Sequence, residues 1–266
     1  MKAQRRHELK ANSLIWTLQG LPQTIKKYQS QISLVLVLIA LAILMVRYRV
    51  NIAQQRLREA QQSLGIATDE LNLLKVRYFG PGDDASQYMK MREEYFGDGL
   101  QQADDAYQKT PDSQASLKAN ALLMKGDLNF QMAGTPPLPG AATQPSLRPS
   151  EPADQLLSGA YDSYSQVLSD YPKLNFATTA ARFGLAAVAE NRAVLNGGSD
   201  ASQWDAARAQ YQAIIDSDAE AAYKAIATAR LQLLPKLSAP VAIGYTAPAI
   251  RAVATQAAKL GPATAP

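Results

Sequence analysis

The sequence contains no cysteine and a single histidine, His7. The lack of cysteine excludes disulfides, thiolate metal sites and a cysteine nucleophile. Because this only histidine stands in a basic N-terminal tail, we expect neither a Ser-His-Asp triad nor a multi-histidine zinc site within the chain. The motifs G-x-x-x-x-G-K, G-x-S-x-G and H-E-x-x-H are also missing. The sequence therefore predicts no enzyme, no cofactor and no metal site, with carboxylates brought together by folding as the one open route to catalysis.

A basic excess is missing from most of the chain, although the net charge is +4. Residues 1–49 hold eight Lys and Arg and a single acid, Glu8, so the remainder carries a net negative charge. A nucleic-acid-binding protein would need a basic face on its folded part. We therefore expect no nucleic-acid partner and assign the basic N-terminus to contact with anionic lipid headgroups.

Only one long apolar run occurs, Ile32–Val46 (ISLVLVLIALAILMV), and it has no charge, proline or glycine. These residues cover about 22 Å of helix, less than the roughly 30 Å hydrocarbon core of a bilayer. Counting from Tyr28 to Tyr48 gives about 31 Å, and these tyrosines with Arg47 suit the two membrane interfaces. We predict a transmembrane helix over 28–48. The alternatives are a cleaved signal peptide, which the long preceding segment disfavours, and a buried helix of a soluble domain.

The segments on either side of the run differ in charge and in pattern. Six Lys and Arg precede it and four follow within a similar distance, which favours a cytoplasmic N-terminus and an extracytoplasmic C-terminal part. Residues 1–27 form a basic segment, in which a helix from Ser13 towards Gln19 could lie at the membrane surface; the alternative is a mobile tail. Residues 49–82 have helical spacing and predict a stalk or the first helix of a domain.

Residues 83–237 are rich in alanine, glutamine and leucine, which predicts an all-α fold. Ala-x3-Tyr steps recur three times, with a glycine between successive steps and a proline closing the second helix. These are the predicted repeat-packing residues: Ala103, Tyr107, Gly126, Ala160, Tyr164, Pro172, Gly184, Ala207 and Tyr211.

The pattern resembles the tetratricopeptide repeat, a helix hairpin with a Gly on its first helix and A-x3-F with a closing Pro on its second. That family places about 22 residues between its Ala and the next Gly, close to the separations Ala103–Gly126 and Ala160–Gly184. The other separations are longer by two insertions, a Pro-rich stretch over 134–152 and one around Gly197-Gly198. The resemblance implies a helix-hairpin superhelix; the alternative is a generic helical bundle with coincidental spacing.

With the span included, the layout resembles single-span bacterial membrane proteins with a degenerate tetratricopeptide domain, of the ancillary Sec-translocon subunit type. The resemblance implies an inner-membrane anchor, a repeat domain outside the cytoplasm, and contacts with a translocon or chaperone. The expected role is a membrane-anchored protein-interaction scaffold, and the alternative is a self-associating structural envelope protein. The candidate partner-facing residues on the superhelix are Asn120, Lys125, Asn129, Arg182 and Glu190.

Two Pro-containing segments complete the chain. We interpret the insertion over 134–152 as inert and flexible, with a polyproline-type ligand at its P-x-x-P sequence as the alternative. In the C-terminal tail, residues 238–266, proline and glycine frame a short helix over 249–260 with one apolar stripe. This helix could cap the open end of the stack, and the alternative is a frayed tail.

Overall fold

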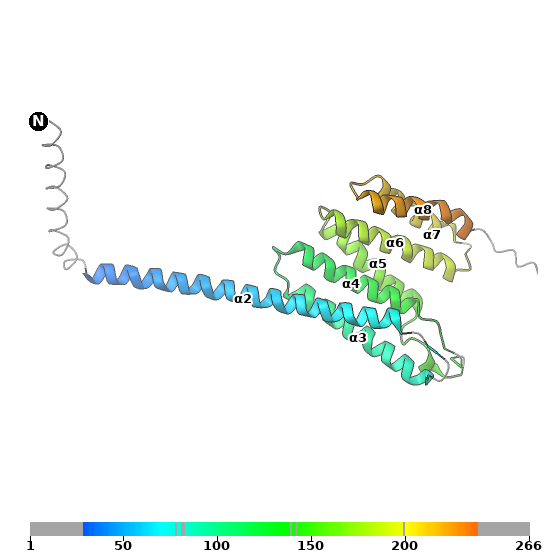
Figure 1. The fold of residues 1–266 in the computed structure, drawn as a ribbon, viewed down its shortest axis with the longest axis horizontal. Coiled ribbons are helices and arrows are strands. Elements are labelled where there is room, and N and C mark those ends of the chain that lie inside the picture. Colours follow the sequence, from blue (N-terminus) through cyan, green and yellow to red (C-terminus); the bar gives the residue numbers. More distant parts are fainter. Residues whose placement is uncertain are drawn as a thin grey trace, which may run out of the picture. The chain divides into compact units, whose positions relative to one another are not determined.

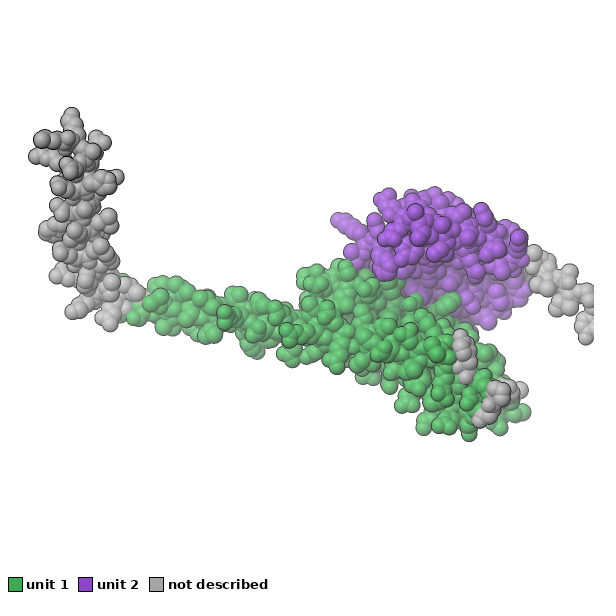
Figure 2. All heavy atoms as spheres, viewed as in Figure 1, with its two compact units in different colours: residues 1–150 green, residues 151–266 purple. Residues whose placement is uncertain are grey.

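The computed structural model describes residues 29–238, except residues 78, 81, 82, 139, 142 and 199. Over this part the chain forms seven α-helices and one short 3₁₀ helix with no strand, so the prediction of an all-α chain is confirmed there (Figure 1). Tyr28 and the predicted helices at 13–19 and 249–260 lie outside the described residues. The chain divides into two compact units, Met1–Ser150 (unit 1) and Glu151–Pro266 (unit 2), coloured separately in Figure 2.

The first part of α2 (Gln29–Val76) is apolar and exposed. Its large apolar side chains between Leu34 and Val46 are 50–63% exposed. The helix is long and apolar enough to cross a membrane, and none of its most apolar window is buried inside the protein. This exposure is the opposite of what the buried helix of a soluble domain would show.

The second part of α2 belongs to the packed core of unit 1. α3 (Ala85–Lys109) and α4 (Ala115–Ala133) both pack against it. Buried residues follow one another at steps of three and four, as expected for one helix face: Ala60, Ser63, Ala67, Leu71 and Leu74. The helix is continuous from the apolar run to this stripe. Of the two predictions for 49–82, the structure therefore favours the first helix of a domain over a free stalk.

Arg92 of α3 joins the end of α2 to the segment after α4. Its side chain, 5% exposed, donates hydrogen bonds to the carbonyl of Leu74 (2.9 Å) and to the hydroxyl of Thr135 (2.7 Å). The Leu74 carbonyl is among the last four of α2, which have no partner within the helix and form the negative end of its dipole. Among the described residues no ion pair involves Arg92, so neutral oxygens and this dipole stabilise its charge.

The Pro-rich connection between α4 and α5 (Ala153–Asp170) is packed onto α3, which differs from the predicted inert, flexible insertion. Its backbone closes on itself where Leu138 N–H donates to the Leu147 carbonyl (3.1 Å), at the end of η1 (Pro145–Leu147). The backbone N–H of Ser150 donates to the Glu93 carboxylate of α3 (2.6 Å). Apolar residues of the connection share one buried cluster with α3: Tyr88, Met89, Leu138, Ala141 and Leu147.

Unit 2 is a run of four helices, each packed on the next: α5, α6 (Asn175–Leu195), α7 (Ala201–Ile215) and α8 (Ala221–Leu237). Gly184 of α6 lies directly against α5. A Cβ added to this glycine would lie 2.5 Å from the ring of Tyr164, which is 2% exposed. The absence of a side chain at 184 is therefore required for this helix contact.

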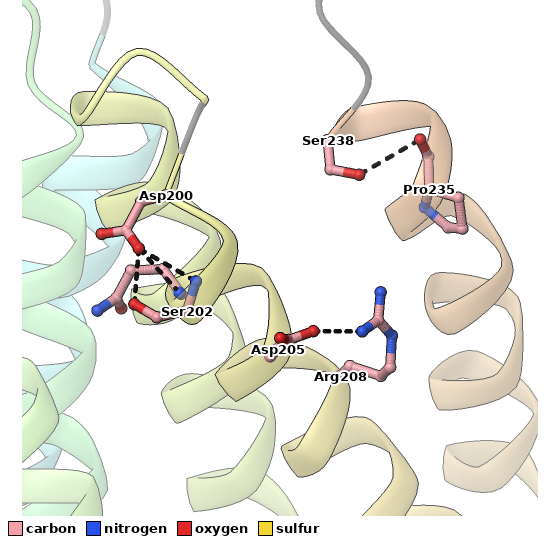
Figure 3. Close-up of polar contacts among 7 residues, drawn as sticks. Asp200, Ser202, Asp205, Arg208, Pro235 and Ser238 are labelled. Atoms are coloured by element: carbon pink, nitrogen blue, oxygen red, sulfur yellow. Dashed lines mark hydrogen bonds and ion pairs between the residues drawn. The ribbon is translucent and has the colours of Figure 1, made fainter.

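The turn between α6 and α7 has two glycines in the left-handed region, Gly197 (φ 73°) and Gly198 (φ 77°). Residues that have a Cβ rarely adopt this backbone conformation. The indole N–H of Trp204 donates to the Gly198 carbonyl (3.0 Å) and fixes the turn against α7. Asp200 then caps α7 by accepting hydrogen bonds from the N–H groups of Ser202 and Gln203 (Figure 3).

We predict that Arg92→Met lowers the free energy of unfolding of unit 1 by about 3 kcal/mol, since buried oxygens lose their donor. The check is chemical denaturation of the full chain in detergent. The matched control is Arg58→Met, an exposed arginine of α2 with no ion pair among the described residues, which should change stability by less than about 0.5 kcal/mol. Equal effects of the two variants would contradict the role of Arg92 in joining the end of α2 to the segment after α4.

Gly184→Ala should destabilise unit 2 by roughly 1–3 kcal/mol, because the new methyl group overlaps the buried ring of Tyr164. Gly97→Ala is the control, since a Cβ at that helical glycine of α3 meets nothing within 4 Å. It should stabilise unit 1 by up to about 1 kcal/mol through helix propensity. Thermal unfolding followed by circular dichroism measures both. A tolerated Gly184→Ala would show that the α5–α6 contact is not close-packed.

Candidate functional site

Most of the predicted repeat-packing residues are buried inside their own unit. In unit 1, Ala103 is fully buried on α3 and Gly126 is buried on α4. In unit 2, Ala160 and Ala207 are fully buried and Tyr211 is 4% exposed. Small residues at these points allow helices to approach closely, as the predicted pattern requires. The superhelix itself stays a prediction.

Tyr164 and Gly184 form the close contact between α5 and α6 described above, whereas Tyr107 and Pro172 have different surroundings. Tyr107 of α3 is half-buried, and the ammonium group of Lys118 lies 5.3 Å from the centre of its ring. That distance corresponds to a cation–π contact. Pro172 is exposed in the turn between α5 and α6. Its contribution is therefore to end α5, since proline cannot donate the next helical hydrogen bond.

The three candidate partner-facing residues of α4 are unequally accessible. Asn120 is exposed. Lys125 is half-buried and forms an ion pair with Asp104 of α3 (2.5 Å). Asn129 is 9% exposed, and its amide donates to the Lys125 carbonyl (2.8 Å). Of these, Asn120 offers the freest side chain for contact with a partner.

On α6, the candidates Arg182 and Glu190 differ in the same way. Arg182 is half-buried, whereas Glu190 is 6% exposed. The Glu190 carboxylate accepts hydrogen bonds from the Tyr211 hydroxyl (2.8 Å) and from the Arg230 guanidinium. Glu190 thus joins α6, α7 and α8 from within unit 2, and little of it is accessible to a partner.

The Glu190 cluster also perturbs the titration of its partners. Burial, followed by the hydrogen bond to Glu190, raises the pKa of Tyr211. The same carboxylate raises the pKa of Arg230, through a hydrogen bond first and charge attraction second. Tyr211 therefore stays a neutral donor and Arg230 a cation at physiological pH. The arrangement stabilises a buried carboxylate.

A cavity of about 360 Å³ lies beside Arg92 in unit 1, with Phe79, Tyr88 and Pro136 among its walls. A buried cation beside aromatic walls could attract an anionic group. The donors of Arg92, however, already serve the carbonyl of Leu74 and the hydroxyls of Tyr88 and Thr135. We therefore interpret this cavity as part of the packing between α2, α3 and the Pro-rich connection, and not as a ligand site.

Carboxylates gather between α2 and α3 around Glu70. Burial raises the pKa of Glu70, with further contributions from Asp98, Asp69 and Glu94. One of its carboxylate oxygens is buried without a hydrogen-bond partner among the described residues. Over the same part of the chain, no group of three or more His, Asp or Glu residues could hold a metal ion. We therefore assign no role to this cluster.

An exposed apolar stripe on α8 was not predicted from the sequence. Ile226, Leu233 and Leu237 follow at steps of seven and four, which places them on one helix face. They are 56%, 44% and 47% exposed, whereas Ala227 and Leu234 of the same helix are buried against α6 and α7. The periodicity of the sequence shows that α8 is apolar on two sides, but only the packing shows which side is left uncovered.

Replacing Arg230 tests whether the Glu190 cluster is structural. Arg230→Met leaves a buried carboxylate with one neutral donor, and we expect a loss of roughly 1–3 kcal/mol, reduced by the partial exposure of the arginine. Arg208→Met is the control, since it removes only the exposed pair with Asp205 (Figure 3) and should cost less than about 0.5 kcal/mol. Denaturant unfolding gives both values. Adding Glu190→Gln to Arg230→Met should recover part of the loss, and no recovery would contradict the buried-charge explanation.

Comparison with known proteins finds no matching family model, no matching curated protein and no matching solved structure. The likeness to the tetratricopeptide repeat therefore rests on the residues of this chain alone.

Proposed function

We propose that this protein is a membrane-anchored scaffold that binds another protein and catalyses no reaction. The observation that carries the proposal is the continuity of α2. One helix presents an uncovered apolar segment and then enters the core of unit 1 without a break. An apolar segment of this length, exposed on every side, is stable when a bilayer covers it. The folded units are then held at the membrane surface.

The stripe on α8 supports the binding part of the proposal. Large apolar side chains that line up on one exposed helix face are typical of surfaces that another protein covers. Ile226, Leu233 and Leu237 meet this description. Asn120 and Arg182 are the predicted partner-facing residues that could add polar contacts.

The likeness to single-span tetratricopeptide proteins supports a more specific version. In it the N-terminus is cytoplasmic, the two units lie outside the cytoplasm at a bacterial inner membrane, and the partner belongs to protein translocation or to chaperone action. Six positive charges before the span against four after it favour this direction. The second candidate function is self-association, in which the α8 stripe of one copy meets another copy.

Site-specific photo-crosslinking of the full chain in intact membranes tests the proposal. A photoreactive residue replaces Leu233 in one variant and Gln232 in the control, because Gln232 is exposed but turned about 100° away on the same helix. We expect an adduct with a different protein from position 233 and a much weaker one from 232. A reporter fused to the C-terminus should be active only outside the cytoplasm.

Each other result has a definite meaning. An adduct of twice the mass of the chain favours self-association over a separate partner. Equal adducts from both positions contradict a role for the stripe. Release of the chain from membranes by alkaline carbonate contradicts the anchor, and a cytoplasmic reporter contradicts the translocation version.

A further inference from the structure

A basic groove lies in unit 1 where α2 leaves the packed helices towards its apolar segment. It has a volume of about 430 Å³, with one wall from α2 and the other from the turn between α3 and α4. Figure 1 shows this turn beside the middle of α2. The residues that define the basic groove are Arg49, Ile52 and Arg56 of α2, and Lys109, Asp112 and Lys118 at the turn.

The α2 wall has a regular pattern. Arg49 and Arg56 are seven residues apart, two helical turns, and therefore point from the same face. Ile52 lies between them on that face. The wall thus offers two cations about 10 Å apart with an apolar side chain between them, which suits a molecule that is anionic and partly apolar.

The charges of the groove do not cancel. Lys118 forms an ion pair with Asp112, and Lys109 forms one with Asp105 (3.0 Å). Among the described residues no ion pair involves Arg49 or Arg56, and both side chains are exposed. Four cations therefore meet only two carboxylates, and the two uncompensated cations are those nearest to the apolar segment.

The turn is held in shape by contacts with the ends of α3 and α4. The hydroxyl of Thr110, which is buried, donates to the Ala106 carbonyl (2.5 Å) and ends α3. Lys118 is only 17% exposed and stacks on Tyr107. Packing as well as charge therefore holds Lys118 in place on its wall of the groove.

The depth of Arg49 and Arg56 in the bilayer favours a lipid headgroup as the ligand. If the span ends at Tyr48, Arg49 lies at the edge of the hydrocarbon core and Arg56 about 12 Å along the helix from Tyr48. Side chains of a helix lean towards its N-terminus, so Arg56 leans back towards the membrane. The headgroup layer is roughly 5–8 Å thick on each side of the core. Arg49 and Arg56 thus reach the level of lipid phosphates.

We propose that the basic groove binds the headgroup of an anionic phospholipid, with its phosphate between Arg49 and Arg56 and its glycerol and first acyl carbons on Ile52. This inference rests on the membrane anchoring proposed above and adds a specific lipid site to it. The bound lipid would link α2 to the α3–α4 turn at the membrane surface.

Native mass spectrometry of the full chain in neutral detergent tests the site, with phosphatidylglycerol and phosphatidylcholine as the probes. We expect preferential binding of phosphatidylglycerol. Arg49→Gln with Arg56→Gln should weaken this binding about tenfold or more, since each cation near a lipid surface contributes measurably. The control pair, Arg58→Gln with Lys75→Gln, removes the same charge from exposed α2 residues that lie outside the groove and farther from the apolar segment, and should weaken it less than about twofold. Because all four side chains are exposed, thermal unfolding should be unchanged in both pairs.

Three results would overturn the site: equal weakening by the two pairs, no preference for phosphatidylglycerol, or displacement of the lipid by inorganic phosphate at equal concentration. The last would mean that the groove recognises free phosphate instead of a lipid. Carbonate extraction of the wild-type chain separates this inference from the anchor. A chain that resists extraction but shows no lipid preference contradicts the groove alone, whereas a chain that is extracted contradicts the anchor itself.

Discussion

The close contact between the second half of α2 and α3 is the constraint on which unit 1 depends. Ala60, Ser63 and Ala67 have small side chains that allow a close approach to α2, and Gly99 has the same effect on α3. A Cβ at Gly99 would lie 2.9 Å from the side chain of Leu128 and 3.3 Å from the Cβ of Glu70. The contact brings the C-terminal end of α2 to Arg92. It also brings the part of α2 around Arg49 and Arg56 to the turn between α3 and α4, where the two form the basic groove. Both features would be lost if α2 were a free stalk.

Buried charge is used differently in the two units. In unit 1, Arg92 is stabilised by neutral oxygens and by the end of a helix dipole. In unit 2, Glu190 is stabilised by a cation and a phenol from the two following helices. Removing one partner of such a group costs more than the group contributes to net stability, because an unpaired buried charge remains. These residues therefore specify which helix ends meet, whereas the apolar residues supply most of the stabilisation.

The sequence predicted helices and small-residue contacts better than it predicted polar partners. The apolar run, the all-helical composition and the small size of Ala103, Ala160 and Ala207 are local signals, and the structure has helices there with these alanines buried. The helical spacing of residues 49–82 did not reveal the buried stripe that includes Ala60 and Ala67. In a helix contact the smallest side chains mark the nearest approach, and hydropathy does not single them out.

The features that were not predicted depend on residues far apart in the chain. Arg230 lies 40 residues from Glu190, and Thr135 lies 43 from Arg92. Nothing in the spacing of a lone arginine identifies its acceptor, because the acceptor is set by how the helices pack. The same holds for the basic groove, since Arg56 and Lys118 meet only after α3 and α4 fold back along α2. The Pro-rich connection was misjudged for a related reason: Leu138 and Leu147 find their partners on α3.

The continuity of α2 has a mechanical consequence. A helix of 48 residues is about 72 Å long, and here it has neither a proline nor a described break at the point where it leaves its apolar segment. Such a helix transmits bending and twisting moments along its length, as a flexible linker cannot. A sideways pull on unit 1 would therefore tilt the apolar segment in its surroundings. If α2 spans a bilayer as proposed, a change in bilayer thickness, to which spanning helices respond by tilting, would reorient unit 1.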